Sequence, residues 1–164
     1  MTRGVHEYAA RLVWDGNNGT GTATYAGYGR EYRVLMGGKP DLAGSADPMF
    51  RGDSGRHNPE DLFLAAISAC HMLSYLALCA RQGIRVVAYE DDVRGVMKLD
   101  ERGGGKFEEV ELHPAVTIEA SGDPATAREL QERALELHEK AHELCFIAAS
   151  CSVPIRHEPT VRSA

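Results

Sequence analysis

Four cysteines, Cys70, Cys79, Cys145 and Cys151, are the residues best suited to covalent chemistry in this chain. A thiolate attacks peroxides and disulfides, and two thiols within reach form a disulfide reversibly. No C-x-x-C spacing occurs, so the thioredoxin-type and zinc-ribbon patterns are missing. Cys70 and Cys79 fall in one predicted helix, about half a turn out of phase and roughly 13 Å apart along its axis. They therefore cannot bridge each other.

Cys70 is a candidate reactive thiol, and Cys145 is its candidate partner. Reactive thiolates need a positive field and partial access to solvent, and several arginines precede the Cys70 helix: Arg51 and Arg56 in the loop before it, Arg30 and Arg33 further upstream. Cys145 stands where the pattern of a second predicted helix ends, and backbone N–H groups at such a helix break are expected to lower the pKa of its thiol. Cys79 and Cys151 are predicted to be packing residues.

A competing motif is the segment "HEKAH", which matches the H-E-x-x-H pattern of zinc hydrolases. His138 and His142 would bind zinc, and Glu139 would act as the general base. Lys140 places a cation inside the motif, and no residue stands out as the third ligand among Cys145, His157 and Glu158. The zinc hydrolase is therefore a distant alternative.

Hydrophobic patterning predicts an α+β domain, with two long central helices packed against antiparallel sheets. Alternating residues predict strands within 7–16 and 22–35, followed by a long loop over 37–57. Asn58 and Pro59 begin a helix that Gly83 ends after Gln82. Further predicted elements are a hairpin-forming strand region over 90–120, a helix over 124–145 with an apolar stripe, and a final strand over 153–161.

Length and charge restrict the possible functions. The chain has 164 residues and a net charge of −6, which fits one domain over 1–164 and argues against nucleic acid or an anionic membrane surface as a partner. The N-terminal segment has no apolar signal-like stretch, and no run reaches the roughly 18–20 apolar residues of a membrane span. A cytoplasmic location is the expectation.

The stretch "NPEDLFLAAISAC" (58–70), with a second cysteine about 75 residues later in "AHELCFIAAS", resembles the OsmC/Ohr family of thiol-dependent hydroperoxide reductases. The early "WDG", the following "GTGT" and the terminal "VPIRHEPTV" also fit, so the resemblance covers nearly the whole chain. It implies the OsmC-like fold, in which two chains form an intertwined homodimer, and it implies no metal or organic cofactor.

The resemblance also implies roles for individual residues. Cys70 corresponds to the peroxidatic thiol, Cys145 to the resolving thiol, and Glu60 to the acid that orients an arginine near the thiolate. Arg51 is the favoured arginine and Arg56 its rival, with Arg30 and Arg33 less favoured. The implied substrates are organic hydroperoxides and, more weakly, hydrogen peroxide, and the implied reductant is a lipoyl-type dithiol. Phe146 replaces the proline that usually follows the resolving cysteine.

Helix geometry adds an argument for a dimer. Glu60 lies roughly 15 Å from Cys70 along a straight helix, whereas two antiparallel copies of the helix would bring Glu60 of one chain towards Cys70 of the other. Apolar residues such as Phe63 and Met72 either line a pocket for an alkyl tail or pack in the core. The alternative function is a non-catalytic OsmC-like redox sensor or a binder of hydrophobic ligands.

Overall fold

The computed structural model describes residues 4–119 and 123–164. The chain divides into two compact units, one up to Leu62 and the other from Phe63 onwards. Each unit is described by itself, and the single domain expected over 1–164 stays a prediction.

The first unit is a three-stranded antiparallel sheet in the order β1-β2-β3. Its elements are β1 (Arg11–Trp14), β2 (Tyr32–Leu35), β3 (Leu42–Gly44) and the short 3-10 helix η1 (Pro48–Phe50). Of the one or two strands predicted within 22–35, β2 is present and the rest of the segment is not a strand. Turns precede β2, and the Asn17 side chain accepts hydrogen bonds from the N–H groups of Gly19 and Gly21. The predicted loop over 37–57 holds both β3 and η1.

Helix α1 (Pro59–Arg81) ends one residue before its predicted last residue. Asn58 Oδ1 accepts the N–H of Asp61 at 2.7 Å, and Asp61 Oδ2 accepts the N–H of Asn58 at 3.2 Å. This reciprocal cap satisfies donors at the helix start. Gly83, with a φ of 71°, stops the helix in the left-handed conformation.

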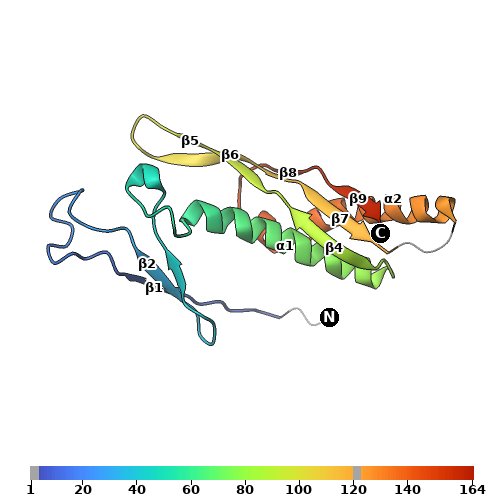
Figure 1. The fold of residues 1–164 in the computed structure, drawn as a ribbon, viewed down its shortest axis with the longest axis horizontal. Coiled ribbons are helices and arrows are strands. Elements are labelled where there is room, and N and C mark those ends of the chain that lie inside the picture. The colour runs from blue at the N-terminus through green and yellow to red at the C-terminus, as the bar shows by residue number, and fades with distance from the viewer. Residues whose placement is uncertain (1–3, 120–122) are drawn as a thin grey trace. The chain divides into compact units, whose positions relative to one another are not determined.

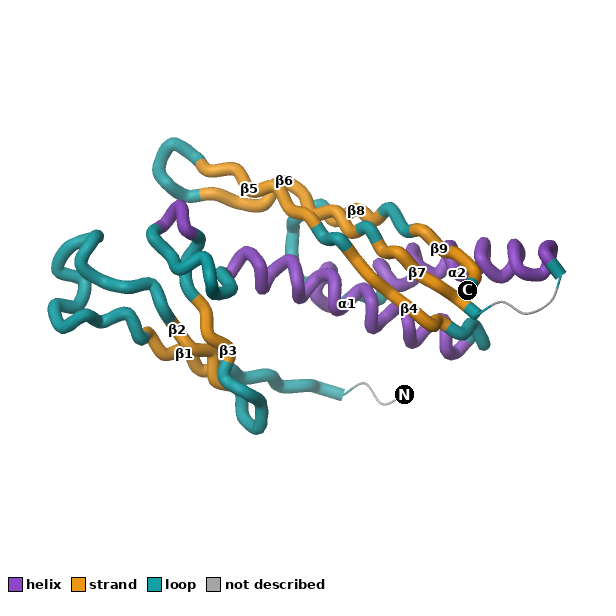
Figure 2. The backbone as a smooth tube through the Cα atoms, viewed as in Figure 1, coloured by secondary structure: helices purple, strands orange, loops and turns teal. Residues whose placement is uncertain are grey.

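The second unit contains two three-stranded sheets whose strands follow one another end to end along α1 (Figures 1 and 2). Their orders are β4-β7-β9 and β5-β6-β8. The strands are β4 (Val86–Asp91), β5 (Arg94–Leu99), β6 (Gly105–Leu112), β7 (Pro114–Ile118), β8 (Ile155–His157) and β9 (Thr160–Ser163).

These sheets are mixed, which corrects the expectation of purely antiparallel pairing. The β5–β6 hairpin was predicted, but β8 joins β6 in parallel and β9 joins β7 in parallel. The single strand expected over 153–161 is therefore two strands, one in each sheet. The α+β class and the two long helices are confirmed.

Helix α2 (Pro124–Glu143) and the four-residue helix α3 (Phe146–Ala149) complete the second unit. Asp123 caps α2 by accepting the N–H groups of Ala125 and Thr126. One hydrophobic core joins α1 and α2 to the β4-β7-β9 sheet, and a second joins the first half of α1 to the β5-β6-β8 sheet. The predicted stripe of α2 is buried at Ala134, Leu137 and Ala141.

Among the residues that the structure describes, one stripe of α1 is buried, at Ile67, His71, Tyr75 and Cys79. The opposite stripe, made of Ala65, Ala69, Leu73 and Ala77, is exposed. By length and composition alone α1 could cross a membrane, but a helix that covers a protein core has the same composition. The sequence predicted a helix covered on most sides, whereas the described residues leave this stripe uncovered.

Candidate functional site

Cys70 and Cys145 come together in the second unit, as proposed from the sequence. Cys70 is half-buried on α1, and Cys145 is buried at the N-cap of α3. Cys70 is one of the groups that raise the pKa of the Cys145 thiol, so the two side chains lie in one neighbourhood.

The environment of Cys145 favours its protonated form. Burial raises the pKa of the Cys145 thiol to about 11, and the neighbouring Cys70 acts in the same direction. The N–H of Ala148 donates to Cys145 Sγ at 3.4 Å and opposes this effect. The sequence prediction of a lowered pKa is therefore wrong: the helix N-terminus is present, but desolvation outweighs it. At neutral pH, Cys145 keeps its proton.

The remaining cysteines differ from each other. Cys79 is buried in the core of the β4-β7-β9 sheet, as predicted. Cys151 is half-buried, and its thiol donates to the carbonyl of Ile147 at 3.4 Å. It also lines an open groove of about 550 Å³, together with Phe63, Lys106, Phe107, Glu108, Ser152, Val153 and Pro154. Phe63 and Phe107 stack with ring centroids 5.1 Å apart, so the groove has an apolar wall and a charged rim.

In the first unit, Glu60 shares a cavity of about 250 Å³ with Arg30. The Arg30 guanidinium donates to the carbonyls of Tyr28 and Tyr25 and lies over both tyrosine rings. These contacts hold the guanidinium in place. The other residues that line this cavity are Tyr32, Ser45, Ala46, Asp47, Phe50 and Pro59.

The other candidate arginines have different surroundings. Arg51 is exposed and has a φ of 68°, at the end of η1. Arg56 pairs with Asp53 at 3.3 Å. Arg33 pairs with Asp15 at 2.7 Å and with Asp41 at 3.4 Å. Arg30 lines the cavity that Glu60 lines, and these three arginines are not among its lining residues.

A cluster of histidines fills the interior between α1, α2 and β8. His71 Nε2 lies 3.0 Å from His138 Nδ1, and the two rings stack. The His157 ring is 5.4 Å from that of His71 and 5.5 Å from that of His142. Burial lowers the pKa of His71 to about 4 and that of His138 to about 3. Both imidazoles are therefore neutral at pH 7.

The "HEKAH" segment does not form a hydrolase site in this arrangement. His138 is fully buried and bonded to His71, whereas Glu139 is 80% exposed and contacts His157 Nε2 at 3.3 Å. Among the described residues, the group whose ligand atoms lie close enough for one ion contains none of these three. Their i, i+4 spacing places His138 and His142 on the same side of α2, but tertiary packing buries His138 in the core.

The chain was compared with known protein families and structures. A profile of the family described as OsmC-like protein matches residues 52–159, a range that includes α1, Cys70 and Cys145. The chain belongs to the OsmC-like family. No sequence among curated proteins matches it.

Solved structures of OsmC-like proteins share the fold. An OsmC-like protein of unknown function from Vibrio cholerae is 27% identical, with a TM-score of 0.80 over 94% of this chain and 99% of that one. An organic hydroperoxide resistance protein from Elizabethkingia anophelis is 21% identical, with a TM-score of 0.66 over 99% of each chain. Such a protein from Bacillus subtilis is 19% identical, with a TM-score of 0.55 over 94% of this chain and 98% of that one.

Two features of this OsmC-like protein could not be predicted from its sequence. The first is the cluster of buried histidines, which are far apart in the sequence and, as polar residues, would be expected at the surface. The second feature is a group of Glu111, His113 and Glu158 in the second unit. Their only sequence signal is a Glu-x-His pair at the end of a strand, which is too common to single out.

Proposed function

We propose that this protein is a thiol-dependent peroxidase that reduces organic hydroperoxides and, more weakly, hydrogen peroxide. The observation that carries the proposal is the proximity of Cys70 to Cys145, whose pKa it raises, in a chain of the OsmC-like family. The pKa of Cys145 supports the division of roles: Cys145 stays protonated, so Cys70 is the thiol that supplies the nucleophile. Because the cycle ends with free thiols, a reducing compartment such as the cytoplasm suits it.

The first chemical step is attack of the Cys70 thiolate on the outer peroxide oxygen. The O–O bond breaks, the sulfur becomes a sulfenic acid, and the alkoxide takes a proton and leaves as the alcohol. The Cys145 thiol then attacks this sulfur, which forms a disulfide and releases water. A dithiol such as dihydrolipoamide reduces the disulfide by two exchange steps and becomes a cyclic disulfide.

The proposed substrate class draws on the open groove that Phe63 and Phe107 line. Phe63, which is seven residues before Cys70, stacks with Phe107 on the apolar wall. Seven residues are nearly two helical turns, so Phe63 and Cys70 project from the same face of α1. An alkyl or aryl tail buried against the wall would gain about 25 cal/mol for each Å² of apolar surface covered. This favours organic hydroperoxides over hydrogen peroxide.

Glu60 and one arginine complete the proposed charge arrangement. Arg51 was favoured by the sequence, but Arg30 shares a cavity with Glu60, so both arginines need testing. Arg30→Met and Arg51→Met remove the positive charge but keep much of the apolar length. We expect Arg30→Met to lower kcat/KM for cumene hydroperoxide more strongly than Arg51→Met.

We also propose that the protein is a homodimer. The exposed stripe of α1 consists of Ala65, Ala69, Leu73 and Ala77, and Leu73 alone leaves 62% of its surface uncovered. An apolar helix face of this kind is costly in water, and small side chains allow a second helix to approach closely. Sedimentation at micromolar concentration tests this, and a monomer would refute it.

The central experiment measures the consumption of cumene hydroperoxide with dihydrolipoamide. Wild type is compared with Cys70→Ser and Cys145→Ser, and Cys79→Ala is the matched control because it removes a thiol that lies in the other hydrophobic core, outside the pair and the groove. We expect Cys70→Ser to abolish turnover and Cys145→Ser to stop after one oxidation. Cys79→Ala should keep turnover close to wild type. Equal rates in all four proteins would refute the mechanism.

Mass spectrometry separates the peroxidase from the alternative functions. After one equivalent of peroxide, the wild type should lose two hydrogens as a Cys70–Cys145 disulfide, and Cys145→Ser should gain one oxygen. A disulfide that forms once but is not reduced by dithiols would indicate a redox sensor. Absence of oxidation at Cys70 would leave binding of hydrophobic ligands as the better reading.

A further inference from the structure

In the second unit the chain crosses from one sheet to the other three times. We call each crossing a passage, and the line along which the two sheets meet the seam. β4 continues into β5, β6 into β7, and β8 into β9. The pairing register continues across the seam, because Asp91 is opposite Pro114 and Arg94 is opposite Glu111. The three passages therefore lie side by side, and they bring residues distant in sequence together.

Three metal-binding side chains converge at this seam. One ligand atom each from Glu111, His113 and Glu158 lies within 4.8 Å of the others. Glu111 is the second-last residue of β6, His113 lies between β6 and β7, and Glu158 directly follows β8. His113 Nε2 lies 3.5 Å from Glu111 Oε2. Ligands bound tetrahedrally at about 2.0–2.1 Å from zinc are about 3.4 Å apart, so this spacing suits two ligands of one ion.

Hydrogen bonds outside the group hold His113 in position. Its Nδ1 lies 3.0 Å from the carbonyl oxygen of Asp92. A carbonyl only accepts, so Nδ1 donates, and Nε2 is the ring nitrogen left to face the group. The backbone N–H of His113 donates to Asp91 Oδ1 at 2.7 Å, and Asp91 Oδ2 accepts from Ser68 on α1 at 2.5 Å. Metal-binding histidines are typically held in this way.

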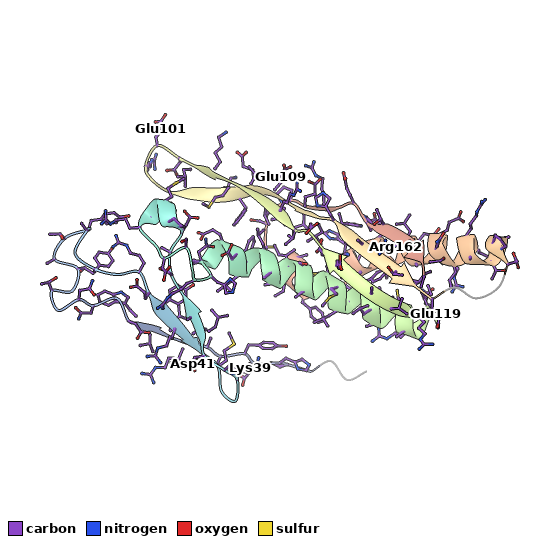
Figure 3. The ribbon with its side chains drawn as sticks, viewed as in Figure 1. Lys39, Asp41, Glu101, Glu109, Glu119 and Arg162 are labelled. Atoms are coloured by element: carbon purple, nitrogen blue, oxygen red, sulfur yellow. The ribbon has the colours of Figure 1, made fainter. Side chains whose placement is uncertain are left out.

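This arrangement places His113 Nε2 and two carboxylates next to one another. Two carboxylates at this spacing repel each other unless a cation lies between them. Arg156, opposite Glu111 on β8, pairs instead with Glu109, which Figure 3 shows on β6. Among the described residues, no ion pair joins Arg94 to Glu111.

We propose that Glu111, His113 and Glu158 bind one divalent transition-metal ion, with Zn²⁺ the best fit. One imidazole and two carboxylates form a mixed nitrogen and oxygen set, which suits zinc better than Mg²⁺ or Ca²⁺, since those prefer oxygen alone. The ion would link the β6–β7 passage to the β8–β9 passage and so stabilise the place where the two sheets meet. This site is separate from the proposed peroxidase chemistry and does not depend on it.

Zinc calorimetry at pH 7.5 on chelator-treated protein without a histidine tag tests the proposal. We expect one strong equivalent of Zn²⁺ for the wild type. Glu111→Gln and Glu158→Gln should each weaken binding by about tenfold or more, at least the loss seen when an outer partner is removed. Glu90→Gln is the matched control, because it removes one exposed carboxylate of β4 near the seam but outside the group. Its affinity should equal that of the wild type.

Two further measurements make the test decisive, because thiols and other histidines also bind zinc. Co²⁺ bound at the seam should show visible absorption without the intense near-ultraviolet band of thiolate ligation. A hundredfold excess of Zn²⁺ over its Kd should raise the Tm of the wild type by about 5 °C or more, but not that of Glu158→Gln.

Three results would overturn the proposal. The first is no stoichiometric binding by the wild type, and the second is equal binding by both glutamine variants. The third is a doubly protonated His113 in NMR at pH 7.5 that Zn²⁺ leaves unchanged, because a proton would then be the cation between the carboxylates.

Discussion

Lowering the pH from 7.5 to 5 should destabilise the fold through His71 and His138. Both imidazoles are buried, and within the described chain His71 Nδ1 and His138 Nε2 have no hydrogen-bond partner. Their folded-state pKa values, about 4 and about 3, lie below the ordinary 6.5. The two histidines therefore do not lower the free energy of unfolding above pH 6.5. That free energy falls as the pH drops from 6.5 towards 4, because in this range the histidines bind protons in the unfolded chain but not in the folded chain.

The magnitude follows from this difference in proton binding. At pH 5 each unfolded histidine is about 1.5 pH units below its pKa, which favours unfolding by about 2 kcal/mol per histidine and about 4 kcal/mol for the pair. The groups around the pair do not reverse the sign. Tyr75, Cys79 and Tyr89 stay neutral because burial raises their pKa values. His142 and His157 add positive charge when protonated, and Glu139 is exposed.

Urea unfolding at both pH values and at one protein concentration measures this effect. The wild type should lose about 4 kcal/mol between pH 7.5 and 5, and His138→Phe, which keeps an aromatic ring next to Tyr75, should lose only about half as much. The matched control is His6→Gln, which replaces an exposed histidine and should keep the full loss. The reasoning fails if His138→Phe has the same pH dependence as the wild type, or if the wild type loses less than about 1 kcal/mol.

Three other substitutions test the packing described above. Ile67→Ala should lower the free energy of unfolding by about 2–5 kcal/mol in urea titrations, because Ile67 is fully buried against Val110 and Leu112. Gly83→Ala should lower the free energy of unfolding by about 1–2 kcal/mol because Gly83 has a positive φ. In the control Gly37→Ala the new Cβ also meets no neighbour, but φ is not positive, so the loss should be far smaller. Equal losses would contradict the backbone explanation. Leu73→Lys should convert the proposed dimer to monomer in sedimentation, and an unchanged mass would place the interface elsewhere.

The helices could be predicted from sequence because their signals are local. Asn58 and Pro59 begin α1, Asp123 and Pro124 begin α2, and each helix ends within two residues of its predicted last residue. The strands of the first unit were harder. The alternation around Leu12 predicts a half-buried strand, but Leu12 is 66% exposed, so the pattern does not report burial within this chain.

Long-range pairing could not be predicted. Nothing in "VPIRHEPTV" shows that its first half joins β6 and its second half β7, because the partner strands lie about 45 residues away. For the thiols, residue types suggested Cys70 and Cys145, but only the family resemblance gave them roles. The raised pKa of Cys145 needed the structure, because desolvation depends on side chains that are distant in the sequence.

The seam between the two sheets has a consequence for how the second unit unfolds. Each passage is one continuous chain, so a strand of one sheet cannot leave without pulling on its continuation in the other. The two hydrophobic cores should therefore open as one cooperative unit. Backbone amides of Val110 in one sheet and Val116 in the other should exchange their hydrogens with the same free energy of opening, even though the two residues belong to different cores.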